Sequence, residues 1–480
     1  MEQLSMTDAF MLSVENEKQT LQMASVSILA PPEGGKPPVT RQVLRDLVAA
    51  RVHLAPALLR KLVRVPLGLD HPYWIEEDDL DLDYHVRAAA VLSPGGDREL
   101  ADLVSDIVTQ PLDHARPLWQ LYAVEGLEGG RVAIIFKLHH ANVDGISGLE
   151  LHSMLFDPMP EGRKIPPRIK SQREAAPSKG AMLLRGLASL SLQPLRSMQA
   201  TAGSLAYLDQ LMPFRVTPGI GTLAELARSG RPAGEKMLLE GAKLKAPRTV
   251  LDQPTISARR RWAFSRVPLA EAKQVKEKSG ASINDVIVAT MAGVLRDLLL
   301  DAKALPDEPL VALVPVSVRS DDAESGGNMV QVMLIELPTN EADAKQRLKL
   351  THEALRSAKE RHSAVPASAM QKANGVLMPA IFVAASQAAA ALTKLMGVTS
   401  NVVVSNVPGP PIPMYVAGHQ VEALYPVGGV VEGFGFSTIV FSYCGDLSLG
   451  FAVADGSPID PWRIAELYKL NHKALASLTA

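Results

Sequence analysis

The chain has 480 residues, of which 47% are apolar and 21% are charged, and its formal net charge is -2. A chain of this length exceeds one hydrophobic core and predicts two large domains. The near-neutral charge excludes the strong basic excess that is typical of nucleic-acid-binding proteins. The one cysteine, Cys444, excludes an internal disulfide and a cysteine-rich zinc site.

The first part of the chain, residues 1–156, is predicted to be a mixed α/β domain. Apolar residues recur at helical spacing over 41–64, where Pro56 divides two predicted helices, and again over 97–110. The mostly apolar run 132–138 has the length of a strand, which is typical of a buried strand. The first residues of the chain do not form a basic segment followed by a long apolar core, so no secretory signal is predicted.

The middle of the chain, residues 157–246, is predicted to link two domains and to contain crossover helices. Residues 157–179 are rich in proline and in basic side chains, which favours an irregular surface segment. Residues 181–211 combine leucines and methionines with few acidic side chains. They predict an amphipathic helix that lies either on an anionic membrane surface or between the two domains.

The last part, residues 247–480, is predicted to be a second α/β domain. One helix is predicted to end at Gly280, and the next to begin at Ser282. The uncharged stretch 373–393 reaches the length of a membrane span, but its alanines and Pro379 favour a buried or membrane-touching helix. The predicted strands and turns are strands 309–319, 330–337 and 402–405, a turn at 406–410, and a hairpin of 438–444 with 447–453 around Gly445 and Asp446.

The sequence HHANVDG, residues 139–145, follows the predicted strand 132–138 directly. Neighbouring residues of a strand point to opposite faces, so His139 and His140 are predicted to diverge. Two such histidines cannot easily bind one metal ion, and no metal site is predicted. His140, at the strand end, is placed to accept a proton from a substrate hydroxyl.

The acidic and glycine residues of the same motif are predicted to shape the turn. Asp144 is the natural partner for fixing it, and Arg60 and Arg64 are candidate partners for this carboxylate. Gly145 indicates a backbone angle or a close approach that a side chain would forbid. The segment SGLE that begins at Ser147 fits a capping box, which predicts a helix start after the motif.

At this point the chain resembles the bacterial wax ester synthase/diacylglycerol acyltransferase family, within the superfamily of chloramphenicol acetyltransferases and peptide-synthetase condensation domains. The H-H-x-x-x-D-G motif by itself indicates the superfamily, and further blocks in the right order indicate the family. These blocks are SMTDAF at 5–10, RPLW at 116–119, ND at 284–285, PVSVR at 315–319 with GN at 327–328, SNVPGP at 405–410, and SY at 442–443 with Gly445.

The resemblance implies a fold of the α/β (α+β) class, with two chloramphenicol-acetyltransferase-like domains, mixed sheets and an interdomain tunnel. It implies that His140 is the general base, while His139, Asp144 and Gly145 are mainly structural. Acyl-CoA is the implied co-substrate. No cofactor, metal or acyl-enzyme is implied.

Residues outside the histidine motif are candidates for substrate binding. Ser405 and Asn406 are candidates for stabilising the oxyanion, because they are predicted to end a strand before a rigid turn. The alternative is that Ser405 and Asn406 only stabilise the predicted turn. Asn284 is a further candidate for substrate contact, although a cap at a helix start is its favoured role.

The function implied is acyl transfer from acyl-CoA to diacylglycerol, giving triacylglycerol, and to fatty alcohols, giving wax esters. Such a protein would be cytoplasmic and peripheral, on the inner membrane face or on lipid droplets, with no nucleic-acid partner. One alternative is an acyltransferase that uses a polyketide or a carrier-protein substrate. Another is a non-catalytic lipid-droplet-binding protein, which sequence alone does not distinguish from an enzyme.

Overall fold

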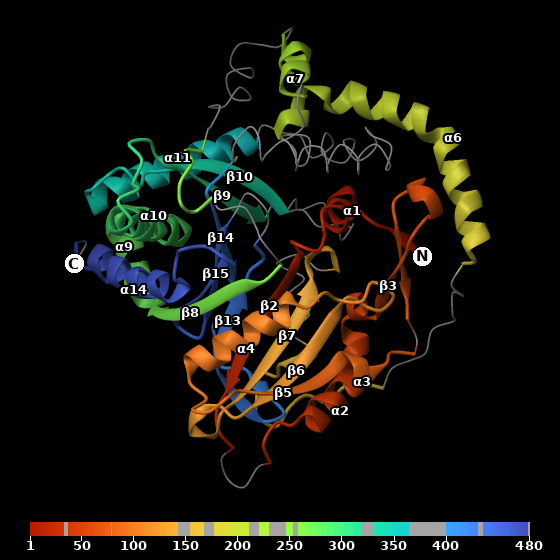
Figure 1. The fold of residues 1–480 in the computed structure, drawn as a ribbon, viewed down its shortest axis with the longest axis horizontal. Helices are drawn as coiled ribbons and strands as arrows, with labels where there is room; N and C mark the ends of the chain where they lie inside the picture. Colours follow the sequence, from red (N-terminus) through yellow and green to blue (C-terminus); the bar gives the residue numbers. More distant parts are fainter. Residues whose placement is uncertain are drawn as a thin grey trace.

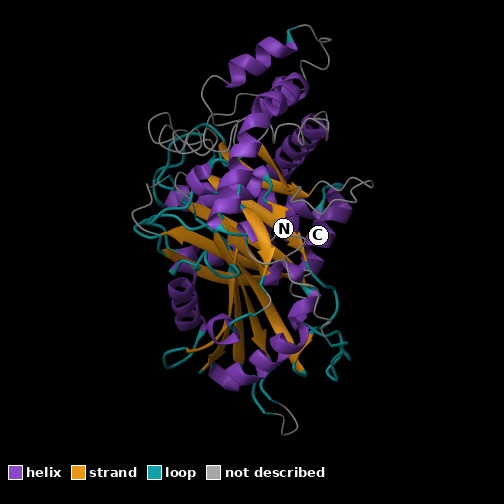
Figure 2. Cartoon of the chain, turned by 90° about the vertical axis from the view of Figure 1, so that its right-hand side faces the viewer, coloured by secondary structure: helices purple, strands orange, loops and turns teal. Residues whose placement is uncertain are grey.

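Two large mixed sheets form the centre of the molecule (Figures 1 and 2). The computed structural model describes residues 1–32, 37–77, 79–142, 154–167, 177–210, 220–229, 246–252, 258–317, 330–363, 400–430 and 435–478. Within these ranges each large sheet has six strands, and a smaller sheet has three. Figure 2 shows the strands running through the middle of the molecule, with most helices outside them.

The sheet in the lower part of Figure 1 contains β7, the strand that ends at the first motif histidine, His139. Its order is β12-β13-β2-β7-β6-β5, and only β5 and β6 pair in parallel among its described pairings. β7 therefore lies inside the sheet, between β2 and β6. The bounds are β2 Gln22–Leu29, β5 Val86–Ala90, β6 Trp119–Glu125, β7 Val132–His139, β12 Tyr415–Val416 and β13 His419–Val427.

The second large sheet is built from the C-terminal part of the chain. Its order is β10-β9-β11-β14-β15-β8, and β11 runs parallel to both of its neighbours while the other pairs are antiparallel. The two sheets thus both mix parallel and antiparallel pairs, as expected. The bounds are β8 Arg260–Pro268, β9 Leu310–Ser317, β10 Val330–Leu337, β11 Val402–Pro408, β14 Phe436–Tyr443 and β15 Asp446–Ala454.

Helices with clear end signals flank these sheets. Before α4, the Glu99 carboxylate accepts a hydrogen bond from Gly96 N at 2.9 Å, and the helix buries an apolar stripe that includes Leu100 and Val104. α9 ends at Gly280, whose φ of 73° is left-handed and suits glycine. The bounds are α2 Arg41–Arg51, α3 Leu82–His85, α4 Asp97–Thr109, α9 Leu269–Ser279, α10 Ile283–Asp301, α11 Ala344–Ser363 and α14 Pro461–Leu478.

Shorter elements and a pair of outlying helices complete the described chain. The small sheet has the order β1-β4-β3. α6 and α7 lie along the upper right and top of Figure 1. The bounds are β1 Glu2–Gln3, α1 Met6–Ser13, η1 Val52–Leu54, η2 Pro56–Leu59, β3 Arg60–Val63, η3 Pro66–Gly68, β4 Tyr73–Glu76, η4 Glu128–Gly130, η5 His140–Asn142, α6 Lys179–Ser204, η6 Leu205–Gln210 and α7 Ile220–Arg228.

One hydrophobic cluster joins the two halves of the chain. It combines α4 and the N-terminal sheet with Trp262 and Phe264 of β8 and with Tyr425 of β13. The ring centroids of Phe264 and Tyr425 lie 4.4 Å apart. Burial of apolar and aromatic surface is the main favourable term in such contacts, so this cluster fixes how the two sheets sit together.

Several predicted elements are confirmed, and three predictions are wrong in part. The helix at 97–110, the strand at 132–138 and the strands at 309–319 and 330–337 correspond to α4, β7, β9 and β10. The second helix predicted across 41–64 is reduced to the short 3-10 helix η2, because the chain after η2 pairs as β3 with β4. Tertiary pairing overrides the local helical spacing there.

The other two differences concern turns in the C-terminal sheet. The turn predicted at 406–410 begins later, because parallel pairing with β14 keeps Asn406 in β11 opposite Val440. The hairpin loop is formed by Cys444 and Gly445, with φ of 49° and 92°, since Asp446 already pairs with Tyr443.

The domain boundaries at 156 and 247 stay a prediction, as does the tunnel. The exchange between the halves is nevertheless clear: β12 and β13 come from the C-terminal range and extend the N-terminal sheet, where β13 pairs with β2. The motif residues Asp144 and Gly145, together with Ser147 and the stretch 373–393, lie outside the described residues. No helix of the described chain is both long enough and apolar enough to cross a bilayer.

Candidate active site

The two motif histidines lie at the end of β7 and differ in exposure. His139 is the last residue of β7, pairs with Gln22 of β2, and its side chain is fully buried. His140 begins the short turn η5 and is half-buried. The difference arises because β7 is buried along its whole length on both faces, whereas His140 already belongs to the turn that follows the strand. His140 is therefore the imidazole that a substrate can approach.

Hydrogen bonds hold the backbone on both sides of the His140 ring. The His140 amide donates to the Leu21 carbonyl at 2.9 Å. The next amide, of Ala141, donates to Nδ1 of His139 at 3.0 Å. The turn that carries His140 is thus tied to the segment before β2 and to the neighbouring buried ring.

Glu15 forms a polar cluster with His139 and His114 at the end of β7. Its carboxylate contacts the His139 Nε2 at 3.0 Å and the His114 Nε2 at 3.2 Å, and it accepts a hydrogen bond from the Leu21 amide at 2.7 Å. Burial alone would raise the pKa of Glu15. Hydrogen bonds from both rings and from the amide outweigh burial and lower this pKa to about 2.

The donors of this cluster also form a candidate metal set, because their ligand atoms lie within 4.8 Å of one another. The protonation pattern of the two rings favours hydrogen bonds to Glu15 over metal binding. Nδ1 of His139 accepts from the Ala141 amide, and Nδ1 of His114 lies 2.8 Å from the Arg64 guanidinium. In each ring the Nδ1 atom accepts a hydrogen bond, so the ring proton lies on Nε2 and points toward Glu15. A metal ion in this cluster would instead need a free lone pair on each Nε2 atom.

Arg260 of β8 reaches the same segment from the other half of the chain. It is 1% exposed and donates to Thr20 O, Thr20 Oγ1, Gln22 O and Gly428 O at 2.8–3.2 Å. Burial lowers the pKa of Arg260 to about 10, and the charge of Glu15 opposes this shift. Arg260 thus clamps both sides of Leu21.

A buried lysine lies on the strand itself. Lys137 is fully buried, and its Nζ donates to the carbonyls of Ile107, at 2.9 Å, and Gln110. Burial lowers the pKa of Lys137 to about 7, and the charges of Arg260 and Arg87 lower it further. These contacts bind β7 to the end of α4.

The predicted cap at Asn284 is wrong, because Ser282 occupies the cap position of α10. The Ser282 hydroxyl accepts from the Asp285 amide at 3.2 Å, and the Asp285 carboxylate accepts from the Ser282 amide at 2.7 Å. Asp285 also lies 2.8 Å from His352 Nδ1. The second residue of the ND block therefore has a structural role.

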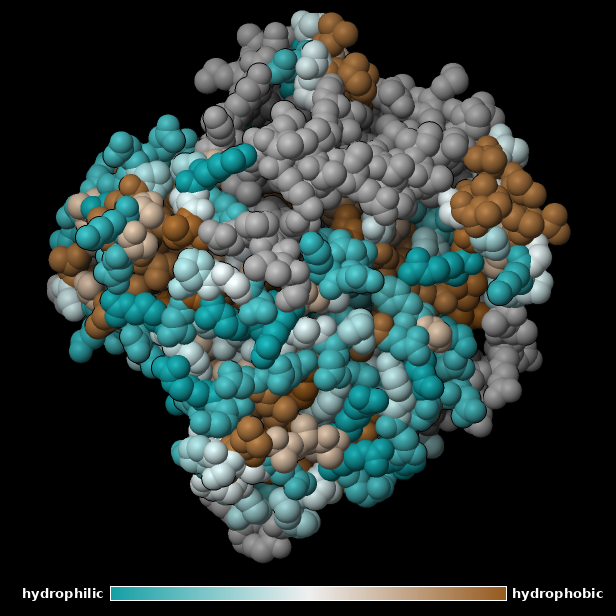
Figure 3. All heavy atoms as spheres, viewed as in Figure 1, coloured by the Kyte–Doolittle hydropathy of each residue, from teal (hydrophilic) through white to brown (hydrophobic). Residues whose placement is uncertain are grey.

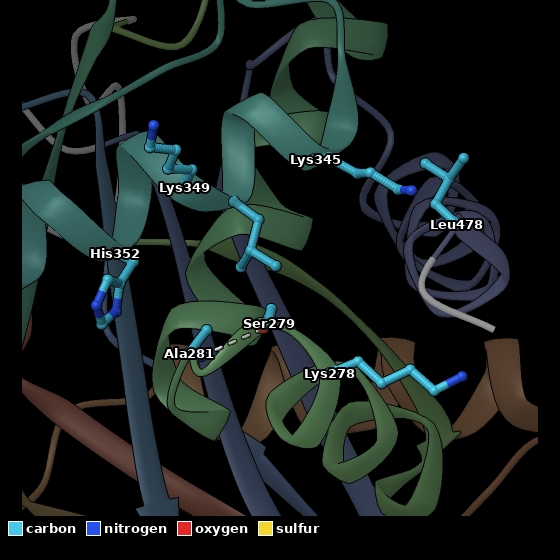
Figure 4. A pocket seen from close by; sticks show the side chains of 8 residues that line it. Lys278, Ser279, Ala281, Lys345, Lys349, His352 and Leu478 are labelled. Carbon is cyan, nitrogen blue, oxygen red and sulfur yellow. Dashed lines mark hydrogen bonds between the residues drawn. The ribbon is translucent and has the colours of Figure 1, made fainter.

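His352 lines a pocket of about 440 Å³ on the helical layer of the C-terminal half (Figure 4). Lys278, Lys345 and Lys349 surround it, and all three are exposed. The pocket is formed by α9, α11 and the end of α14, whereas His140 lies at the end of β7. The predicted site residues do not line it.

The remaining predicted residues are only partly placed. Ser405 and Asn406 lie half-buried on β11, and no described contact joins them to His140. Arg60 lies 3.1 Å from Glu2, while Arg64 contacts His114. Whether either reaches Asp144 lies outside the described residues.

Sequence reasoning missed Glu15, His114 and Arg260, and it considered Arg64 only as a partner for Asp144, whereas Arg64 contacts His114. None of them belongs to a spaced motif, and they are up to 245 residues apart in the chain, from 15 to 260. Charged side chains are usually exposed to solvent, so no local feature of the sequence indicated that these residues meet. Only the packing of α1, β7 and β8 does so.

Comparisons with known proteins cover almost the whole chain. Residues 4–287 match the wax ester synthase/diacylglycerol acyltransferase catalytic domain, and residues 326–475 match the C-terminal domain of the same enzymes. A probable diacylglycerol O-acyltransferase of Mycobacterium tuberculosis is 30% identical over 457 residues, with 92% of each chain covered. A putative diacylglycerol O-acyltransferase of that organism is 34% identical over 450 residues, with 93% of each covered.

Solved structures agree with these matches. The wax ester synthase/diacylglycerol acyltransferase from Marinobacter aquaeolei is 26% identical, with a TM-score of 0.70 and full coverage of both chains. The first condensation domain of the calcium-dependent antibiotic synthetase is 15% identical, with a TM-score of 0.55 and coverage of 100% of this chain and 96% of that one. The latter likeness concerns the fold alone.

Proposed function

This chain belongs to the wax ester synthase/diacylglycerol acyltransferase family, and we propose that His140 is the general base of its acyl transfer. The activity is that of a diacylglycerol O-acyltransferase, which forms triacylglycerol and wax esters. We propose acyl-CoA as the donor. The observation that carries the assignment of the base is the half-buried position of His140 at the end of β7, beside the fully buried His139.

The proposed chemistry needs one base and no covalent enzyme intermediate. The imidazole of His140 accepts the proton of the acceptor hydroxyl as its oxygen attacks the thioester carbonyl. The tetrahedral intermediate then collapses, the carbon–sulfur bond breaks, and the thiolate of CoA leaves with the proton from the imidazolium. The products are an ester and free CoA.

The supporting roles of the other predicted residues are part of this proposal. Asp144 and Gly145 shape the turn after His140. Ser405 and Asn406 are candidates for stabilising the oxyanion, because they are polar and half-buried on an internal strand. Asn284 is the least supported substrate contact, since it lies in the first turn of α10 behind the Ser282 cap.

The acceptor alcohol and the ester product are apolar, so we propose that the protein works on a membrane or lipid-droplet surface on the cytoplasmic side. The α6 region exposes leucines: Leu184 is 70% and Leu187 49% exposed, and Leu67 of η3, against which α6 packs, is 84% exposed. Figure 3 shows a brown patch on that side of the molecule. Exposed apolar side chains of this kind favour an interfacial contact.

The test of the membrane proposal is flotation with vesicles of phosphatidylglycerol and phosphatidylcholine. The double variant Leu184→Glu/Leu187→Glu is expected to lose most of its vesicle binding, while Leu92→Glu, at an 80% exposed position after β5, keeps it. Equal binding by both variants would contradict a contact through α6.

The test of the catalytic proposal is ester formation by purified protein from labelled palmitoyl-CoA, with diacylglycerol and hexadecanol as parallel acceptors. His140→Ala is expected to lower the rate about 10²–10⁴-fold, which is the usual contribution of a general base. The ratio of the two products gives the acceptor preference. Undiminished activity of His140→Ala would refute the assignment of the base.

Two further outcomes distinguish the alternative functions. Ester formation only from an acyl group on a carrier protein would favour the carrier-dependent acyltransferase. A folded protein that binds droplets but forms no ester from either donor would favour the lipid-droplet-binding protein.

A further inference from the structure

The Glu15 carboxylate connects to the backbone of His140 by two separate paths. On one path it accepts the Leu21 amide at 2.7 Å, and the Leu21 carbonyl accepts the His140 amide at 2.9 Å. On the other it contacts the His139 ring, whose Nδ1 accepts the Ala141 amide at 3.0 Å. The peptide units before and after His140 are therefore both held, through one intermediate each, by the same carboxylate.

His114, the second histidine of the cluster, contacts the other oxygen of the Glu15 carboxylate. His114 Nε2 lies 3.2 Å from the second carboxylate oxygen, and Arg64 holds the opposite nitrogen of that ring at 2.8 Å. Since Arg64 has only N–H donors, it keeps the His114 proton on Nε2. Glu15 thus accepts a hydrogen bond from the Leu21 amide and faces the Nε2 atoms of two rings, an arrangement that suits an ionised carboxylate.

We propose that Glu15 is a positioning residue for the His140 general base, acting through His139 and Leu21, and that Arg64 and His114 hold its carboxylate in place. This inference rests on the proposed function of His140. Glu15 touches neither reacting atom. Its effect is to fix the base in its productive position, where misplacement by about 1 Å can cost on the order of 10²-fold in rate.

Glu15→Gln tests this proposal with nearly the same side-chain volume. The oxygen of the new amide can still accept from the Leu21 amide and face the His139 ring. The NH2 group of the amide, however, would face the N–H of His114. Two donors then oppose each other. We expect kcat to fall about 10- to 100-fold, with the KM for palmitoyl-CoA changed less than about threefold, because the shift affects the base and not substrate affinity.

A second substitution makes the test specific to the proton pattern. In Glu15→Gln/Arg64→Met, His114 is released from Arg64, so its proton can move to Nδ1 and Nε2 can accept from the new amide. We expect the double variant to recover at least about threefold in kcat over Glu15→Gln alone. A purely structural loss would not be reversed by removing a second, exposed side chain.

The control is Glu17→Gln, which changes an exposed carboxylate two residues away and is expected to keep the wild-type kcat. A wild-type kcat in Glu15→Gln would overturn the proposal, and so would a further loss in the double variant. If Glu15→Gln fails to fold by circular dichroism, Glu15→Asp replaces it, with an expected kcat loss and unchanged KM, and a wild-type kcat again overturning the proposal.

The two proposals fail separately. Activity that survives His140→Ala removes the general base, and with it the role of Glu15. An inactive His140→Ala together with a fully active Glu15→Gln leaves the base in place and refutes only the positioning role.

Discussion

Arg260 offers the sharpest test of how the two halves of the chain hold the active-site strand. Its guanidinium makes four hydrogen bonds to Thr20, Gln22 and Gly428, and 1% of the residue is exposed. Arg260→Lys keeps the buried charge but replaces a planar fork with one ammonium group. At least one acceptor then loses its donor, while the desolvation cost remains.

The magnitude follows from the bonds that are lost. A hydrogen bond from a charged donor contributes about 1.5–3 kcal/mol, so the loss of one or two corresponds to about 3 kcal/mol. Because the m-value grows with chain length, a value of roughly 5 kcal/mol/M is expected for a chain of this size, and the urea midpoint should fall by about 0.6 M. We also expect kcat to fall by roughly tenfold, because the loosened segment carries the Leu21 carbonyl that holds the His140 amide.

The assay is urea-induced unfolding followed by tryptophan fluorescence, together with the rate of ester formation. Arg259→Lys is the matched control, since the Arg259 side chain is 60% exposed and its contact with Asp106 is 3.6 Å long. The control should change stability by less than about 0.5 kcal/mol. If Arg260→Lys unfolds within about 0.3 M of the wild-type midpoint, the clamp does not hold the two halves as described.

Three other predictions concern stability. The pKa of Glu15 is lowered from 4.5 to about 2, so its ionised form should stabilise the fold by about 3 kcal/mol above pH 4.5. This stabilisation should be lost as the pH falls toward 2. In urea unfolding, the difference in unfolding free energy between the wild type and Glu15→Gln should therefore be smaller at pH 3 than at pH 7. The pKa of Lys137 is lowered from 10.5 to about 7, so the unfolded chain binds a proton that the folded one lacks between these values, and stability should rise with pH across that window. Lys137→Met should flatten this rise, and an unchanged slope would contradict the assignment. A Cβ at Gly450 would lie 1.7 Å from the Pro426 carbonyl oxygen, so Gly450→Ala should force β15 and β13 apart and cost about 3 kcal/mol or more by thermal unfolding, whereas Gly221→Ala, where a Cβ meets open space, should not destabilise.

Local patterns in the sequence predicted the elements that build the site. The apolar run of β7, the spacing of α4 and the glycine after α9 each depend on a short window of residues, and the structure confirms them. Strand alternation predicted that His139 and His140 diverge, whereas the structure distinguishes them because β7 ends at His139 and His140 begins η5. The errors occur where pairing with a distant strand decides, as in β3 and at the end of β11.

The sequence by itself therefore determined the family and the histidine at the strand end, because motifs and periodicities are properties of neighbouring residues. The two mixed sheets were implied by the resemblance to that family. Only the tertiary structure decided that Glu15 meets His114 and His139, that Arg260 grips the segment before β2, and that β13 joins the N-terminal sheet. These contacts join residues that no local rule relates. They form because the burial of apolar surface around β7 and β8 brings distant polar groups together, and the buried ones, such as His139 and Arg260, then need hydrogen-bond partners.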